Sequence, residues 1–227
     1  MTRWAGLRLG DALTVKHGFA FLGEYFTELG DRIVLTPGNF VERGGFKPKS
    51  GAEKYYSGAV PAPYLLKKGD VVVAMTEQSA GLLGSSATIP ADDVYLHNQR
   101  IGLVQISDPS RLEPRFAYHL LNAPGVRAQI QATATGSKVR HTAPSRIEDV
   151  VAPVPCSGAQ RVIAGVLDSI DELIENNRRR VELLEQMAQA IYREWFVHFR
   201  YPGHEHDELI DSPPRPNPLR LVGGDDF

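Results

Sequence analysis

The fold is decided by residues 160–199, which read QRVIAGVLDSIDELIENNRRRVELLEQMAQAIYREWFVHF. Apolar side chains recur in this stretch at alternating intervals of four and three residues, as they do along the seam of a coiled coil. The predicted seam consists of Ile163, Leu167, Ile170, Ile174, Asn177, Val181, Leu184, Ala188, Ile191 and Trp195. Because no proline interrupts the stretch, it predicts one helix of about 60 Å, at about 1.5 Å per residue.

A helix of this length needs a partner. A domain of about 150 residues is too small to cover such a rod along its whole length, so part of the apolar stripe should pack against another helix. A third column widens that stripe: Val166, Leu173, Arg180 and Met187. Asn177 is the polar member of the seam. It either fixes register and partner number from a buried position, or faces solvent where the stripe breaks.

The residues before the helix predict a strand-rich mixed domain. Short β-branched runs bounded by Gly, Pro and Asp are typical of strands, and examples are residues 32–35, 70–75 and 101–106. The run after Asp70 is continuously apolar, which indicates a strand buried on both faces. Helical patterning occurs at residues 114–122 and 126–133. We therefore predict an α+β protein, a strand-rich mixed domain followed by a long coiled-coil-forming helix.

Prolines mark the expected domain limits. Pro153 and Pro155 remove backbone donors and hold the chain extended, which places a boundary between a domain at residues 1–152 and a linker with the long helix at residues 153–203. Ser157 or Gly158 can cap that helix, which should begin near Gln160. Residues 204–227 are proline-rich and without periodicity, so we expect a flexible tail.

Composition excludes several classes of protein. No apolar run approaches the roughly 18 residues of a transmembrane helix, and the start of the chain does not resemble a secretory signal. The single cysteine, Cys156, excludes an internal disulfide framework, fits a cytoplasmic location, and is expected to be a small buried or half-buried side chain. Residues 1–152 carry 17 basic and 14 acidic residues. This small positive excess is compatible with a DNA-binding face but does not indicate one.

Motifs of the common catalytic and metal sites are missing. The sequence has no phosphate-binding loop, no glycine-rich dinucleotide motif and no Cys/His metal spacing. It also lacks the motifs of methyltransferase and nuclease active sites. His204 and His206 flank Glu205 in the tail, which is too weak a pattern for a metal site. We therefore predict no catalytic residues, no metal and no cofactor, and the sequence favours binding over catalysis.

Short motifs occur in a fixed order along the chain: Leu9-Gly10-Asp11, His17–Phe21, Pro37–Phe40, Lys68–Val73, Asn98–Arg100, Thr135–Ser137 and Gln160–Asp171. Each is weak alone, but together they resemble the specificity subunit of type I restriction-modification enzymes, the subunit that recognises DNA. The resemblance implies a non-catalytic chain whose partners are double-stranded DNA, a modification (methyltransferase) subunit and, where one is present, a restriction subunit. It also implies that S-adenosylmethionine binds the modification subunit and ATP the restriction subunit.

The chain departs from the resemblance in one respect. Members of that family usually carry two target recognition domains and two antiparallel spacer helices, whereas this sequence has one of each. We therefore expect two copies to pair through the seam as a homodimer that reads a palindromic, interrupted target. Pairing with a different half subunit is one alternative. An interaction or scaffold protein that keeps the fold without binding DNA is the other.

Long polar loops between the strands are the candidate DNA-reading elements. They span residues 42–58, 76–86 and 134–143, and loops longer than a connection requires often carry function. Glutamine pairs with adenine, glutamate accepts from cytosine, and arginine binds guanine or phosphate. The candidate DNA-contacting residues are Lys47, Lys49, Thr76, Glu77, Gln78, Ser79, Ser137, Lys138, Arg140 and His141. The alternative for each is a solvated loop side chain.

Overall fold

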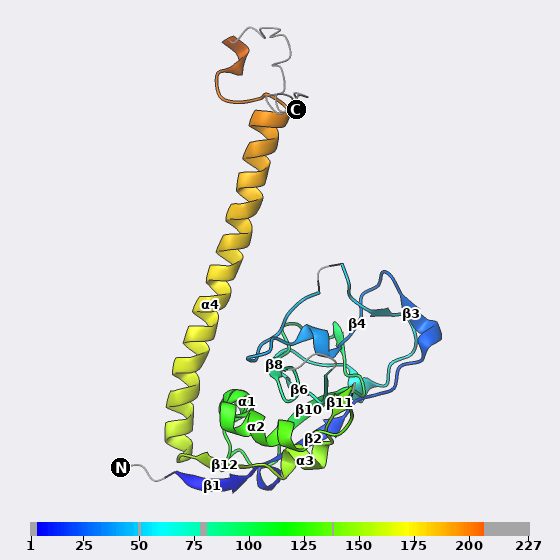
Figure 1. The fold of residues 1–227 in the computed structure, drawn as a ribbon, viewed down its shortest axis with the longest axis vertical. Helices are drawn as coiled ribbons and strands as arrows, with labels where there is room; N and C mark the ends of the chain where they lie inside the picture. Colours follow the sequence, from blue (N-terminus) through cyan, green and yellow to red (C-terminus); the bar gives the residue numbers. More distant parts are fainter. Residues whose placement is uncertain (1–3, 50, 78–80, 138, 207–227) are drawn as a thin grey trace, which may run out of the picture. The chain divides into compact units, whose positions relative to one another are not determined.

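The computed structural model describes residues 4–49, 51–77, 81–137 and 139–206 (Figure 1). The chain divides into two compact units, Met1–Ile170 and Asp171–Phe227. The first unit contains the described strands and helices α1 to α3, and the long helix α4 begins in it and continues into the second. The predicted class, a strand-rich α+β domain followed by a long helix, is confirmed.

The first unit is built around an antiparallel sheet with strand order β2 (Leu13–His17), β10 (Ile101–Ile106), β6 (Val71–Ala74) and β8 (Ser86–Thr88). Successive side chains of a strand point to opposite faces. In β6, Val73 packs into one core cluster while Val72 and Ala74 pack into another. The prediction that this run is buried on both faces is therefore confirmed.

Three helices supply the layer on one face of this sheet: α1 (Pro114–Asn122), α2 (Pro124–Ala132) and α3 (Pro144–Glu148). Each begins with proline in its first turn, where the missing N–H breaks no helical bond. The carboxylate of Glu113 caps α1 by accepting a hydrogen bond of 2.7 Å from the backbone N–H of Phe116. Leu120 and Ile130 lie in the core cluster beneath these helices. The bounds of α1 agree with the prediction, and α2 begins two residues early, at Pro124.

A two-stranded ribbon joins the start of the chain to the base of α4. Strand β1 (Ala5–Arg8) pairs antiparallel with β12 (Val151–Val154), with Leu7 opposite Ala152. Both of these side chains are buried in the main core cluster. The segment that we predicted as an extended linker is thus a strand, and the first compact unit continues past residue 152 to Ile170. The functional division at residue 152 stays a prediction.

The remaining strands are short. A second sheet has the order β3 (Phe26–Thr27), β5 (Tyr55–Tyr56), β4 (Ile33–Val34) and β9 (Tyr95–Leu96), and Figure 1 shows it at the opposite end of the first unit from α1. It surrounds a small core that contains the ring of Tyr56. Strand β7 (Thr76–Glu77) pairs with β11 (Arg140–His141). Single 3-10 turns occupy Leu9–Asp11, Gly23–Tyr25, Pro37–Asn39, Ala62–Tyr64 and His204–His206.

Helix α4 spans Ser157–Tyr192 and continues as a π-helical turn over Arg193–Val197. It therefore begins three residues before the predicted start, because Ser157 lies inside the helix. Trp195, the last predicted member of the seam, lies in the π turn, whose wider repeat departs from the heptad spacing. Cys156, just before the helix, is exposed, so the expectation that it is buried or half-buried was wrong. Within the described residues, no helix is long and apolar enough to span a membrane.

Candidate nucleic-acid interface

The second and third candidate loops, residues 76–86 and 134–143, are joined by a short antiparallel ladder. Strand β7 pairs with β11 so that Arg140 lies opposite Glu77 and His141 opposite Thr76. The backbone N–H of Thr142 extends this contact by donating to the carbonyl of Met75 at 2.9 Å. The structure thus brings together predicted residues that are about 60 positions apart in the sequence, as ladder pairing of distant segments allows.

Glu77 and Arg140 form an ion pair across this ladder. Nη1 of Arg140 donates to Oε1 of Glu77 at 2.9 Å, and Nη2 donates to the carbonyl of Gln131 at 2.9 Å. The Glu77 side chain is only 2% exposed, whereas that of Arg140 is 41% exposed. The other oxygen of Glu77 accepts from the backbone N–H groups of Gly81 and Leu83. A base contact by Glu77 would require breaking these bonds, so the structure favours Arg140 as the outward-facing member.

The third loop is a tight hairpin. Thr135 and His141 exchange backbone hydrogen bonds, and their side chains meet at 3.1 Å. Gly136 has a φ of +100°, and a Cβ at that position would lie 2.1 Å from the carbonyl oxygen of Val139. Only glycine fits such a turn without strain. Ser137 and His141 are exposed on this hairpin, where they can reach a ligand.

The first loop is hydrogen-bonded to the second loop. The N–H of Gly45 donates to the carbonyl of Ser86 at 2.9 Å, and the hydroxyl of Ser85 donates to the carbonyl of Val41 at 2.6 Å. Further along this loop Lys47 is exposed and Lys49 is half-buried. Among the described residues, no hydrogen bond links Lys47 or Lys49 to the hairpin that carries Arg140.

Lys49 lies in a less solvated position than a typical surface lysine. Its side chain crosses Gly38 so closely that a Cβ on that glycine would lie 2.7 Å from Cε of Lys49. Burial, and then the nearby ammonium of Lys54, lower the pKa of Lys49 below its ordinary value. Gln78, Ser79 and Lys138 lie outside the described residues.

Sequence reasoning missed Arg127 of α2. This side chain is 8% exposed, and its guanidinium donates to the carbonyls of Glu42, Gly81 and Leu83. It therefore ties the first candidate loop to the second. The sequence did contain a signal that Arg127 lies on the buried face of α2. It is three residues before Ile130 and directly after Val126, both buried in the core, and helical positions three apart share a face.

The predicted seam residues of α4 are largely uncovered. Ile170 is 48% exposed and Leu184 is 62% exposed, and Asn177 is also exposed. Ile163 differs because it is partly buried against the core of the first unit. The third column is exposed as well, at 59% for Leu173. An apolar stripe this long on one helix is typical of a surface that packs against other helices.

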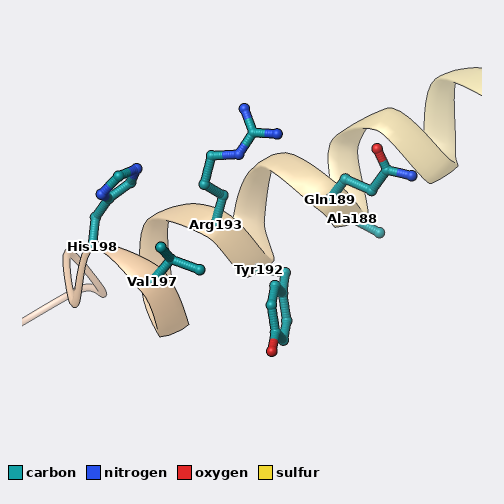
Figure 2. Close-up of a pocket in the computed structure, with 6 residues that line it drawn as sticks. All are labelled: Ala188, Gln189, Tyr192, Arg193, Val197 and His198. Atoms are coloured by element: carbon teal, nitrogen blue, oxygen red, sulfur yellow. The ribbon is translucent and has the colours of Figure 1, made fainter.

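An open hollow of about 630 Å³ lies at the end of the helix, beside the ring of Tyr192 (Figure 2). The rings of Tyr192 and Phe196 stack with their centroids 5.3 Å apart. The hollow is lined by Ala188, Gln189, Tyr192, Arg193, Val197 and His198. Because Tyr192 and Phe196 are not members of the predicted seam, their rings add a second apolar surface to the helix end. Among the described residues, no cluster of His, Cys, Asp or Glu could hold a metal ion.

Comparison with known proteins gives consistent matches over the first unit and most of α4. Residues 1–186 match the family model of the type I restriction modification DNA specificity domain. The chain is 26% identical over 186 residues to the type I restriction enzyme EcoBI specificity subunit of Escherichia coli, covering 82% of this chain and 36% of that protein. It is 23% identical over 197 residues to the MjaVIII specificity subunit of Methanocaldococcus jannaschii, covering 83% and 44%.

Solved structures show the same fold. The S subunit of a type I restriction-modification system from M. genitalium superposes with a TM-score of 0.65 at 19% identity, over 86% of this chain and 46% of that one. A chain from a structure of type I restriction-modification complex assembly superposes with a TM-score of 0.53 at 17% identity, over 84% and 45%. The chain thus spans less than half the length of these relatives.

Proposed function

Because this chain belongs to the family of type I restriction modification DNA specificity domains, we propose that it reads one half of a bipartite DNA target and docks modification subunits on that DNA. The observation that carries the proposal is that the family match includes two different surfaces of this chain. Residues 1–186 include both the loop face around Arg140 and most of the exposed stripe of α4. One element would read DNA, and the other would set the distance between two readers.

The reading surface consists of groups suited to base edges and phosphates. Arg140 is oriented by Glu77 and by the carbonyl of Gln131, and a guanidinium has five N–H donors, so donors remain for guanine or a phosphate. His141 and Ser137 are exposed beside it. Lys47 and Lys49 add positive charge on the first loop. Gln78, Ser79 and Lys138 remain predicted contacts on sequence grounds.

The stripe of α4 supports assembly as a homodimer. Ile170, Ile174, Val181 and Leu184 are between 43% and 62% exposed, and burying them against a second copy removes apolar surface from water. In a two-fold dimer each copy reads the same half-site, so the target would be an interrupted palindrome. We propose an antiparallel arrangement of the helices, as expected from the family resemblance.

Apolar surface beyond the two-helix seam supports docking of a modification subunit. Val166, Leu173 and Met187 are 51% to 59% exposed and lie on the third column, and Phe196 and Phe199 are exposed at the helix end. A seam between two helices uses only two columns. The chain itself would perform no catalysis. The modification subunit would bind S-adenosylmethionine, and a restriction subunit, where present, would bind ATP.

Light scattering coupled to size-exclusion chromatography tests the assembly, on the chain alone and mixed with a candidate modification subunit. A dimer alone and a larger complex in the mixture are expected, whereas a monomer that ignores the modification subunit would contradict the proposal. Selection from a pool of randomised duplexes tests DNA reading, because a specific reader enriches a bipartite sequence. A complex that assembles but enriches no sequence would favour the scaffold alternative. Pairing only with a different half subunit would favour a heterodimer.

A further inference from the structure

Arg127 is a buried cation whose guanidinium, among the described residues, forms hydrogen bonds with backbone carbonyls. Its side chain is 8% exposed, and among the described residues it forms no ion pair. Nη1 donates to the carbonyl of Glu42 at 2.7 Å, Nη2 to that of Gly81 at 2.5 Å, and Nε to that of Leu83 at 3.2 Å. A buried charge without a contacting counter-ion is costly. The contribution of Arg127 to the structure must therefore come from these hydrogen bonds to the two loops.

Two carboxylates near the guanidinium oppose the effect of burial on its pKa. Burial lowers the pKa of Arg127, while the carboxylates of Glu42 and Glu77 act in the opposite direction. An arginine nevertheless stays protonated in proteins. A hydrophobic residue of similar size would remove this donor from the carbonyls of Glu42 and Gly81 and would leave that of Leu83 only the longer bond of 3.5 Å from Nε2 of Gln131. The position thus favours arginine, whose planar fork can reach several acceptors at once.

Glu77 completes this arrangement from the other side of the loop. Its Oε2 accepts from the N–H of Gly81 at 3.0 Å and from the N–H of Leu83 at 2.8 Å. Gly81 and Leu83 therefore have both backbone polar groups held, the N–H by Glu77 and the carbonyl by Arg127. Gly81 has a φ of +107°, and a Cβ there would lie 2.6 Å from the carboxylate of Glu42. No other residue would fit between these two loops without strain.

The network ends at the outward-facing arginine. Oε1 of Glu77 binds Arg140 at 2.9 Å, so α2, the first loop, the second loop and the hairpin are linked through Arg127 and Glu77. We propose that Arg127 and Glu77 are positioning residues for DNA recognition, which fix the first two loops and the Arg140 side chain before DNA binds. This inference rests on the proposed reading function. It makes specificity, and not bulk affinity, the property that depends on Arg127.

Arg127→Met tests the inference in the full chain assembled with its modification subunit. The probes are a duplex enriched from the randomised pool and an unrelated duplex of equal length. We expect binding to the enriched duplex to weaken by about ten- to hundredfold, the range for losing one or two base contacts. Binding to the unrelated duplex and the slope of affinity against salt should stay unchanged, because Arg127 is buried and touches no phosphate. Arg111→Met is the matched control, since Arg111 is 47% exposed and binds the carbonyl of Asp11.

Amide hydrogen exchange of the chain without DNA gives an independent readout. In Arg127→Met the N–H groups of Gly45 and Leu83 should exchange about tenfold faster, while those of β10 should not change. If Arg127→Met does not fold, Arg127→Lys is used in its place. Glu77→Gln should likewise weaken specific binding through Arg140. Loss of specific and non-specific binding in equal measure, or retention of both, would overturn the inference. A wild-type complex without any sequence preference would instead overturn the proposed function.

Discussion

The carboxylate of Asp168 on α4 accepts a hydrogen bond of 2.7 Å from Nε2 of His119 on α1. Arg115 of α1 binds the other oxygen of the same carboxylate, with its Nε at 2.6 Å. Burial alone would raise the pKa of Asp168, but the hydrogen bonds from His119 and Arg115 outweigh it and hold the pKa below its ordinary value. Asp168 therefore stays ionised and anchors the first part of α4 to the recognition domain.

Asp168→Asn should loosen this anchor. The variant loses the charge that pairs with Arg115, and because the carboxylate is 29% exposed we expect a cost of about 1 kcal/mol in the free energy of unfolding. Urea unfolding measures this change, and faster amide exchange near residues 165–170 would locate it. Glu175→Gln is the control, because its pair with Arg179 is exposed on the same helix. Equal effects of the two variants would contradict a special role for Asp168.

His97 predicts a loss of stability in acid. The ring is fully buried, its Nε2 donates to the carbonyl of Ile101 at 2.9 Å, and its Nδ1 has no partner among the described residues. Burial lowers the pKa of His97 from 6.5 to about 4. Between these values the unfolded chain binds a proton that the folded chain excludes, so stability falls as pH decreases from 6.5 to 4. The full difference corresponds to about 3 kcal/mol.

Urea unfolding at pH 7 and pH 4.5 measures this effect. The wild-type chain should lose more stability between the two pH values than His97→Gln, whose side chain cannot take up a proton. His17→Gln is the matched control, because His17 is exposed with its ring 3.3 Å from the carbonyl of Gly18, and its charge is the smallest of the causes that act on the pKa of His97. A His97→Gln variant with the same pH dependence as wild type would show that another group is responsible.

Two glycines predict opposite results for the same substitution. Gly136→Ala places a methyl group 2.1 Å from the carbonyl of Val139 at a φ of +100°, so it should destabilise the hairpin by about 1–3 kcal/mol and weaken binding to an enriched duplex. Gly125→Ala meets no atom within 4 Å in α2, and should stabilise the domain by up to about 1 kcal/mol. Thermal unfolding and duplex titration measure both. If Gly136→Ala changes neither the unfolding temperature nor the binding to an enriched duplex, the hairpin tolerates a different turn.

The features that could be predicted from the sequence are those with local causes. The period of α4 and the continuous apolar run of β6 each follow from neighbouring residues, and both were found. The strand β12 was missed because its proline-rich sequence resembles a linker. Its partner β1 is about 145 residues earlier in the sequence, so no local pattern indicates the pairing. The ion pair of Arg140 with Glu77 depends on ladder pairing between distant loops. Arg127 was missed for the same reason, since its acceptors are backbone atoms of remote segments that no residue pattern reveals.

Leu183 and Leu184 are adjacent on α4 and similarly exposed, at 57% and 62%, but only Leu184 lies on the predicted seam. Leu184→Lys should therefore disrupt self-association of the chain, while Leu183→Lys should leave it intact. Burying one leucine contributes about 2 kcal/mol, and two-fold symmetry doubles the loss, so the dissociation constant should rise about a thousandfold. Light scattering over a dilution series measures this, and circular dichroism checks that both variants fold. Equal dissociation in the two variants would show that the helices do not meet along this seam.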